Sequence, residues 1–341
     1  MIFFRADSNH QIATGHIMRC ISIAQRFKMH GHSVRFFIAD DNPIPLLEKA
    51  GMDYYVLNST WNDLDYEIPL MRELLKGHDS DFLIIDTYSV TKRYVESLLS
   101  LCKCCYLGSK REYLGELFAL INFSLSVDYG YYPTVYRGKT RLILGPSYIP
   151  LREEFLEGRK ANVTNARCKV MLTTGGSNPN HYMEKILNQV IRNSIFNQID
   201  IEVVIGNLFE NVDDLKEKLI QYGNIHVNEN VNSMAEIMYQ CDLAVTANGS
   251  TVYELVASHV PSITFCLAKD QINTAEKMAA MGLTEYCGNI SEEEVECLNK
   301  ISEKLTLYVC SEQKRIDLAG NAAKIIDGNG VERLYQALMY S

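Results

Sequence analysis

Short apolar runs alternate along this chain with longer segments in which apolar residues recur at every third or fourth position. The first pair is an apolar run at residues 2–6 followed by a helical pattern from about residue 16 to residue 30. The residues that carry this helical pattern are Ile17, Cys20, Ile21, Ala24 and Phe27. Further strands are predicted at residues 34–39, 82–86 and 102–107, and a short helix around residues 46–47. Such alternation predicts β-α-β units and a mostly parallel sheet.

The alternation stops near residues 145–165 and then begins again. Gly145, Pro146 and Pro150 interrupt it, and a polar stretch follows, so we expect a domain boundary here. Beyond it, strands are predicted at residues 169–174, 201–205, 225–227, 243–246 and 262–266, with a helix that ends near residue 193.

The sequence therefore predicts an α/β protein of two Rossmann-like domains that face each other across a cleft. We expect the first domain at residues 1–155 and the second, a nucleotide-binding domain, at residues 165–315. Residues 316–341 are expected to form a C-terminal helix. One possible arrangement is that this helix packs back across the two domains.

Length, composition and charge narrow the class of protein. The chain has 341 residues, enough for two domains of ~150 residues each, and 47% of them are hydrophobic. A formal net charge of -9 argues against a nucleic-acid partner, although a helix N-terminus can still hold a small anion. No apolar stretch approaches the ~20 residues of a membrane span, and the first residues lack a signal-peptide pattern. We therefore expect a cytoplasmic protein with no membrane partner.

The cysteines do not follow the spacing of a metal site. Cys102, Cys104 and Cys105 lie in one apolar run, without a second Cys/His pair at ligand spacing. We expect the ten cysteines to be buried, reduced thiols, and we expect neither a metal ion nor a cofactor.

The loop between the first strand and the first helix carries a candidate catalytic residue. Its single glycine, Gly15, precedes His16, which falls in the first helical turn. Gly15 lets the backbone approach a ligand, and the helix start offers free N–H groups and a partial positive charge. A neutral histidine at this position is suited to act as a general base. The alternative is that His16 only caps the helix.

Two loops of the second half place small residues and exposed N–H groups directly after a strand. One begins with Gly175 and Gly176. The residues of the other are Asn248, Gly249, Ser250 and Thr251. A phosphate group fits such loops, and Glu254, one helical turn further on, is placed to accept hydrogen bonds from ribose hydroxyls. The alternative is that these are ordinary β-α turns and that Glu254 is a capping residue.

Two more strand ends carry polar residues. Asp86 ends the apolar run at residues 82–86, and Tyr88 follows it, where its hydroxyl would bind a sugar or orient His16. Asp270 and Gln271 follow the run at residues 262–266 and begin a helix that points into the same expected cleft. For both aspartates the alternative is a helix N-cap.

The order of these segments resembles that of one family over residues 1 to about 285. The matching segments are Arg5-Ala6-Asp7, Gly15-His16-Ile17-Met18-Arg19-Cys20, Ile84-Ile85-Asp86-Thr87-Tyr88, Leu144-Gly145-Pro146, Leu151-Arg152-Glu153-Glu154-Phe155, Gly175-Gly176, Gly249-Ser250-Thr251-Val252-Tyr253-Glu254 and Asp270-Gln271. They resemble the UDP-2,4-diacetamido-2,4,6-trideoxy-β-L-altropyranose hydrolases of pseudaminic acid biosynthesis and related proteins of spore-coat and surface-polysaccharide clusters. The glycine loops also resemble those of glycosyltransferases of the two-domain type B fold.

The resemblance implies a metal-independent hydrolase that removes UDP from a sugar through attack of water at the anomeric carbon, with inversion. His16 would deprotonate the water and Tyr88 would assist as the second catalytic residue. The residues implied in substrate binding are Asp7, Gly15, Arg19, Asp86, Gly175, Gly176, Asn248, Gly249, Ser250, Thr251, Glu254, Asp270 and Gln271.

Three positions depart from the family pattern. Asp270 stands where the family usually has asparagine, Asn248 replaces the first glycine of its loop, and residues 108–112 stand where a pair of aspartates is common. The sugar, the base, the reaction and the oligomeric state therefore stay open at this stage, although a monomer is compatible with the sequence. The alternatives are a type B glycosyltransferase with a UDP-sugar donor and a non-catalytic nucleotide-sugar-binding protein.

Overall fold

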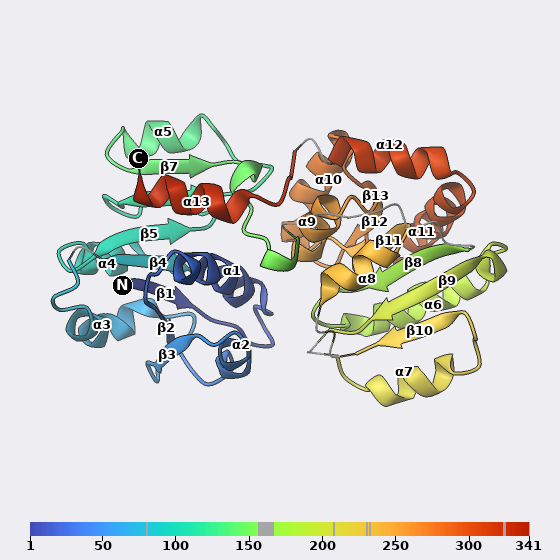
Figure 1. Ribbon diagram of the computed structural model, residues 1–341, viewed down its shortest axis with the longest axis horizontal. Helices are drawn as coiled ribbons and strands as arrows, with labels where there is room; N and C mark the ends of the chain where they lie inside the picture. The colour runs from blue at the N-terminus through green and yellow to red at the C-terminus, as the bar shows by residue number, and fades with distance from the viewer. Residues whose placement is uncertain are drawn as a thin grey trace. The chain divides into compact units, whose positions relative to one another are not determined.

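The computed structural model describes residues 1–340 except 80, 156–166, 207–208, 230, 232 and 323–324. The chain divides into two compact units (Figure 1). Unit 1 comprises Met1–Arg152 and Asn329–Ser341, and unit 2 comprises Glu153–Gly328. None of the helices in the described residues combines the length and the apolar character that a membrane crossing requires.

Unit 1 is built on a seven-stranded parallel sheet with the strand order β3-β2-β1-β4-β5-β6-β7. Its strands are β1 (Ile2–Ala6), β2 (Val34–Ile38), β3 (Asp53–Val56), β4 (Phe82–Asp86), β5 (Lys103–Leu107), β6 (Ala119–Asn122) and β7 (Arg141–Leu144). Its helices are α1 (Gly15–Met29), α2 (Ile44–Lys49), η1 (Leu64–Glu67), α3 (Ile68–Leu74), α4 (Lys92–Leu98), α5 (Tyr131–Tyr136), η2 (Pro146–Tyr148) and α13 (Gly330–Met339). The strand order reverses between β1 and β4, and such a reversal is where ligands bind in open α/β sheets.

Alternate residues of the unit 1 strands belong to different cores. Phe4 of β1 and Ile84 of β4 pack in one cluster with Ile17 of α1. Phe3 and Ile85, their neighbours in sequence, pack in a second cluster on the other face of the sheet. Successive side chains of every β-strand point to opposite faces of the sheet. The same alternation decides to which face each polar residue at a strand end points.

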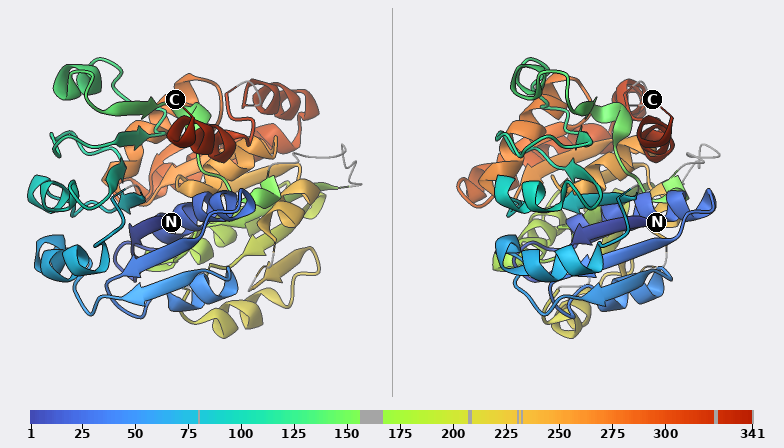
Figure 2. Two further views of the ribbon diagram at one scale, coloured as in Figure 1. Left: turned by 60° about the vertical axis from the view of Figure 1, so that its left-hand side comes forward. Right: turned by 90° about the vertical axis from the view of Figure 1, so that its left-hand side faces the viewer.

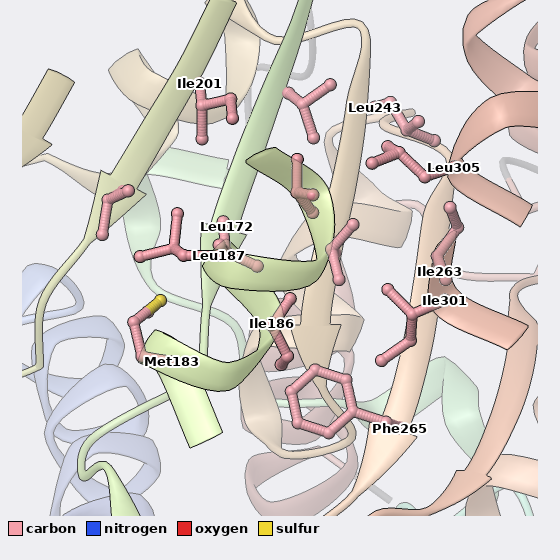
Figure 3. Packing of buried hydrophobic residues seen from close by; sticks show 14 of the residues in the cluster. Leu172, Met183, Ile186, Leu187, Ile201, Leu243, Ile263, Phe265, Ile301 and Leu305 are labelled. Atoms are coloured by element: carbon pink, nitrogen blue, oxygen red, sulfur yellow. The ribbon is translucent and has the colours of Figure 1, made fainter. Parts of the chain in front are cut away.

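Unit 2 repeats the same topology with six parallel strands in the order β10-β9-β8-β11-β12-β13. Its strands are β8 (Cys168–Thr173), β9 (Ile199–Val204), β10 (Ile225–Asn228), β11 (Leu243–Ala247), β12 (Ser262–Cys266) and β13 (Glu285–Asn289). Its helices are η3 (Glu153–Phe155), η4 (Pro179–His181), α6 (Tyr182–Ile191), η5 (Phe196–Gln198), α7 (Val212–Leu219), α8 (Met234–Gln240), α9 (Ser250–Ala257), η6 (Lys269–Gln271), α10 (Ile272–Ala280), α11 (Glu294–Val309) and α12 (Glu312–Ala322). In its core, Ile186 of α6 and Ile301 of α11 pack with Ile263 of β12 (Figure 3).

The C-terminal helix α13 returns to unit 1. It packs on α1, as the left view of Figure 2 also shows. Leu334 and Leu338 of α13 join the α1 side of the core. Gly330, the first residue of α13, lies so close to Ile149 that an added Cβ would stand 2.2 Å from the Ile149 carbonyl oxygen. The chain therefore needs glycine at this contact.

The predicted α/β class with parallel sheets is confirmed, and most predicted strands are found within one or two residues of their expected bounds. Residues 102–107 and 169–174, for example, correspond to β5 and β8. The strands that the sequence pattern did not indicate are β3, β6, β7 and β13.

Replacing Gly206 by alanine is expected to destabilise unit 2. A Cβ on Gly206 would stand 2.2 Å from the Gly175 carbonyl oxygen and 2.6 Å from Gly176 Cα, and both are backbone atoms. Because the backbone must shift, we expect a loss of about 1–3 kcal/mol in the free energy of unfolding. Urea unfolding of G206A measures it, with G223A as control because a Cβ at Gly223 meets no atom within 4 Å. Equal stability of the two variants would contradict the prediction.

Candidate functional site

The reversal point of the unit 1 sheet brings His16 and Asp86 together. β1 and β4 run side by side with Ala6 opposite Asp86, and the loop after β1 leads into α1. Asp86 points to the same face of the sheet as Ile84, the face that α1 covers. On α1, the side chains at three and four residues after His16 lie on the same side of the helix. These are Arg19 and Cys20.

Asp86 is the common partner of these α1 residues. Its Oδ1 lies 2.7 Å from His16 Nδ1, and Arg19 donates from Nε to Oδ2 and from Nη2 to Oδ1. The Cys20 thiol donates to Oδ2 across 3.4 Å. His16 is 5% exposed and Asp86 1%. The carboxylate is thus buried and surrounded by donors.

The charge of Asp86 is fixed by these neighbours. Burial raises the pKa of a carboxyl group, but the Arg19 guanidinium and the His16 ring outweigh burial and lower the pKa of Asp86 to about 2. Asp86 is therefore a carboxylate throughout the neutral pH range.

The alternatives in which His16 and Asp86 are helix caps are wrong. The N-cap position of α1 is Thr14, and the ring of His16 is directed at Asp86. The helix after β4 is capped by Thr91, whose Oγ1 accepts a hydrogen bond of 3.0 Å from the Tyr94 backbone N–H.

Tyr88 lies directly over His16. The two rings meet edge to face with centroids 4.8 Å apart. Tyr88 is 61% exposed, so most of this aromatic side chain faces outward beside the histidine. The Arg19 guanidinium lies 5.6 Å from the centroid of the Phe123 ring. The His16 ring therefore lies beside an exposed aromatic side chain, that of Tyr88.

The loop between β1 and α1 is held by its own residues. Asn9 Oδ1 accepts hydrogen bonds from the backbone N–H groups of Gln11 and Ile12, at 2.8 and 3.0 Å. Ala13 has φ +52°, a left-handed conformation that costs a non-glycine residue free energy. A Cβ on Gly15 meets nothing within 4 Å. The path of the loop is therefore set by Asn9 and Ala13 more than by Gly15.

Asp7 is buried and engaged within the protein. One carboxylate oxygen accepts from Arg5 Nη1, and the other accepts from the Ala39 backbone N–H across 2.7 Å. Its contact with substrate stays a prediction. In the structure, Asp7 connects the start of the loop after β1 to the residue that follows β2.

Arg5, which donates to Asp7, and Glu67, the other partner of Arg5, were not predicted as site residues from the sequence. Arg5 is fully buried and donates from Nε to Glu67 Oε1 at 2.7 Å and from Nη2 to Oε2 at 3.1 Å. Tyr94 and Ser59 also donate to Glu67, each across 2.9 Å. The signal in the sequence was a charged residue inside an apolar strand, on the face opposite to Phe4 and Ala6. Cys20 was likewise predicted only as a core residue.

In unit 2, the predicted loops meet at the corresponding reversal point. β11 pairs in parallel with β8 on one side and with β12 on the other. The carboxyl ends of these three strands therefore share one edge of the sheet, and the loops that follow them are neighbours. The residues placed at this edge are Gly175, Gly176, Asn248, Gly249, Ser250, Thr251, Asp270 and Gln271.

Asn248 is the unusual member of this group. It is 5% exposed, and no described residue makes a hydrogen bond to its Oδ1. Helix α9 starts two residues later, and no side chain caps its first turn. A buried acceptor without a partner costs free energy unless a ligand or water completes it. Asn248 and the start of α9 together therefore have the character of a ligand site.

The other residues of this edge have more ordinary surroundings. Gly175 has φ +87°, which glycine adopts without strain. Gln271 Oε1 accepts from the Leu267 backbone N–H across 2.9 Å, which closes the turn after β12. Asp270 lies inside η6, and the N-cap position of α10 is Gln271. The N-cap alternative for Asp270 is therefore wrong. Glu254 lies within α9, one turn from its start.

The cysteines behave as core residues. All ten are free thiols, and only Cys168 and Cys310 are not buried. Among the residues that the structure describes, no group of three or more His, Cys, Asp and Glu side chains has the arrangement of a metal site.

Comparison with solved structures defines the class of fold. MurG of Acinetobacter baumannii is 12% identical, with a TM-score of 0.66 over 100% of this chain and 99% of that one. The HepE protein of Anabaena, solved with UDP and glucose, is 13% identical, with a TM-score of 0.57 over 100% and 99% of the two chains. The calicheamicin glycosyltransferase CalG4 is 12% identical, with a TM-score of 0.66 over 99% and 97% of the two chains. The chain therefore has the two-sheet α/β fold of these proteins. No family model matches it.

Comparison with curated proteins points to a narrower group, the one that the motifs predicted. The chain is similar to the UDP-2,4-diacetamido-2,4,6-trideoxy-β-L-altropyranose hydrolase of Campylobacter jejuni, with 22% identity over 82% of this chain and 97% of that protein. It is also similar to the spore coat polysaccharide biosynthesis protein SpsG of Bacillus subtilis, with 23% identity over 58% of each chain. An uncharacterized protein of Methanocaldococcus jannaschii is 25% identical over 75% of this chain. The chain spans little more than half of the last two relatives, 58% and 54% of their lengths.

Proposed function

We propose that this protein hydrolyses a UDP-sugar of the diacetamido-trideoxyhexose type, in the biosynthesis of pseudaminic-type acids or of a surface polysaccharide. The observation that carries the proposal is the buried contact of 2.7 Å between His16 and Asp86, beside an outward-facing Tyr88. A histidine held by a carboxylate is a general base suited to neutral pH. The similarity to the Campylobacter jejuni hydrolase over 97% of that protein supports the same reaction.

In the proposed reaction the oxygen of a water molecule forms a bond to the anomeric carbon of the sugar. The bond between that carbon and the diphosphate oxygen breaks, and its electron pair leaves with UDP. His16 takes one proton of the water, and the configuration at the anomeric carbon is inverted. Tyr88, exposed beside the His16 ring, is proposed to contact the sugar.

The loops of unit 2 are proposed to hold the nucleotide. Free N–H groups at the start of α9, at Ser250 and Thr251, would stabilise the charge that develops on the departing diphosphate. The unpartnered amide oxygen of Asn248 would accept a hydrogen bond from the ligand. Glu254 is proposed to accept hydrogen bonds from the ribose hydroxyls.

A glycosyltransferase is the second candidate function. Its support is the fold, because the solved structures above include a glycosyltransferase and a complex with UDP and glucose. In that reaction an acceptor hydroxyl replaces water, and the same base would deprotonate it.

Release of UDP from a panel of UDP-sugars, with and without candidate acceptors, separates these functions. The proposal predicts UDP release from a diacetamido-trideoxyhexose donor at the same rate in both conditions. Release that requires an acceptor would overturn hydrolysis in favour of transfer. Tight binding of UDP-sugars without turnover would overturn both in favour of a binding protein.

A further inference from the structure

His16 Nδ1 has two neighbours that make opposite demands on it. It lies 2.7 Å from Asp86 Oδ1, an acceptor, and 2.8 Å from Arg19 Nη2, a donor. A single ring nitrogen of a neutral histidine either carries a proton and donates, or carries a lone pair and accepts. Only one of the two contacts can therefore be a hydrogen bond, and the choice decides which nitrogen of the ring is left to act as a base.

The partners of Asp86 decide between the two tautomers. Arg19 directs Nε and Nη2 at the two carboxylate oxygens of Asp86, the fork geometry typical of a strong arginine–carboxylate pair. One of the two N–H groups of Nη2 is therefore engaged by Oδ1. If Nδ1 carried a lone pair, it would face the negatively charged Oδ1 across 2.7 Å, and the two acceptors would repel each other. A proton on Nδ1 turns the same contact into a charge-assisted hydrogen bond.

We propose that Asp86 and Arg19 are positioning residues that hold His16 in the tautomer with its proton on Nδ1, so that Nε2 is the base. This differs from the substrate-binding role that the sequence predicted for both residues. The inference rests on the proposed function for its catalytic meaning, whereas the tautomer itself is a property of the folded protein.

Arg19 and Asp86 have separate tasks in this arrangement. Asp86 orients the ring, and it stabilises the imidazolium that forms when His16 takes a proton from water. Arg19 keeps Asp86 ionised at a buried position, where a lone carboxylate would be costly. The low pKa of Asp86, which Arg19 and His16 bring about against the effect of burial, agrees with this task. The Asp86 side chain is fully buried, and 23% of the Arg19 side chain is exposed, so the carboxylate end of the pair is shielded from water.

The direct test is the tautomer of His16, read by two-bond ¹H–¹⁵N NMR of the ring in the full-length protein labelled at histidine. The chain has 8 histidines, and the signal that disappears in H16N assigns His16. In the wild type we expect a protonated Nδ1 and an unprotonated Nε2. A wild-type spectrum with the proton on Nε2 of His16 would overturn the proposal.

The variant Asp86→Asn extends the test. The amide oxygen of asparagine can accept from Arg19, which leaves the amide N–H₂ to donate to Nδ1 and moves the ring proton to Nε2. We expect this switch in the NMR spectrum, together with a fall in kcat of about 10³–10⁴-fold at little-changed KM, as for a triad aspartate replaced by asparagine. A raised KM at unchanged kcat would instead mean that Asp86 binds substrate, and would overturn the proposal.

The chain contains a matched control for this variant. His78 Nδ1 lies 2.7 Å from Asp81 Oδ2, the same contact at the other end of β4. Asp81→Asn is expected to leave kcat and KM at wild-type values, and an equal loss in both variants would show a general structural effect and contradict a positioning role. If the wild type releases no UDP from any UDP-sugar, the proposed function fails, yet the spectra of the wild type and of D86N still decide the positioning role.

Discussion

Replacing His16 by asparagine is expected to lower the rate of UDP release by about 10²–10⁴-fold, the usual contribution of a general base. Asparagine keeps a polar side chain near Asp86 but has no group that can accept a proton from water. The fold should tolerate the change, because Asp86 keeps its hydrogen bonds from Arg19 and Cys20. Single-turnover UDP release measures the effect, and calorimetry with UDP should show unchanged affinity, since the proposed nucleotide loops lie in unit 2.

The control for this variant is His78→Asn. His78 has the same distance of 2.7 Å between Nδ1 and an aspartate, but its partner is Asp81 at the amino end of β4. We expect the wild-type rate for H78N. UDP release by H16N at the wild-type rate would exclude His16 as the base and would leave the contact with Asp86 without a catalytic meaning.

Replacing Arg5 by methionine is expected to cost about 3–5 kcal/mol in the free energy of unfolding, because it leaves two buried carboxylates without a countercharge. Arg5 is the cation between Asp7 and Glu67, all of them at most 3% exposed. Methionine fills much of the same volume, so the lost charge dominates the change. Urea unfolding with detection by circular dichroism measures the difference.

The matched comparison for R5M is an exposed ion pair. Lys216 and Glu229 form one in unit 2, with 40% and 36% of their side chains exposed. Exposed pairs contribute about 0–1 kcal/mol, so K216M should differ little from the wild type. A similar small effect for R5M would mean that the Arg5 cluster is hydrated or protonated in the folded protein, contrary to its burial.

The sequence predicted the central strands better than those at the edges. β4 reads Phe-Leu-Ile-Ile-Asp and is buried along its whole length, and continuous apolar runs of this kind are typical of parallel strands covered on both faces. β3, an edge strand that reads Asp-Tyr-Tyr-Val, alternates between exposed and half-buried residues. β13, at an edge of the other sheet, reads Glu-Tyr-Cys-Gly-Asn and is likewise only partly buried. Such strands lack the strong apolar signal because they have fewer neighbours to pack against.

The candidate site was predictable as a set of residues but not as a set of contacts. His16 and Asp86 were each indicated by their place at a helix start and at a strand end. Their contact depends on the pairing of β1 with β4, which are 70 or more residues apart in the chain and become neighbours only through the strand order. The engagement of Asp7 by Arg5, and the unpartnered oxygen of Asn248, depend on side-chain packing that no periodicity reveals.

Hydrolysis of the UDP-sugar in ¹⁸O-labelled water shows which bond of the substrate the water molecule attacks. Attack of water at the anomeric carbon predicts that the label appears in the released sugar and that UDP stays unlabelled, with inverted configuration in the first product. H16N should release the same labelled sugar, but only at its strongly reduced rate of hydrolysis. Label in the β-phosphate of UDP would show attack at phosphorus and would contradict the account.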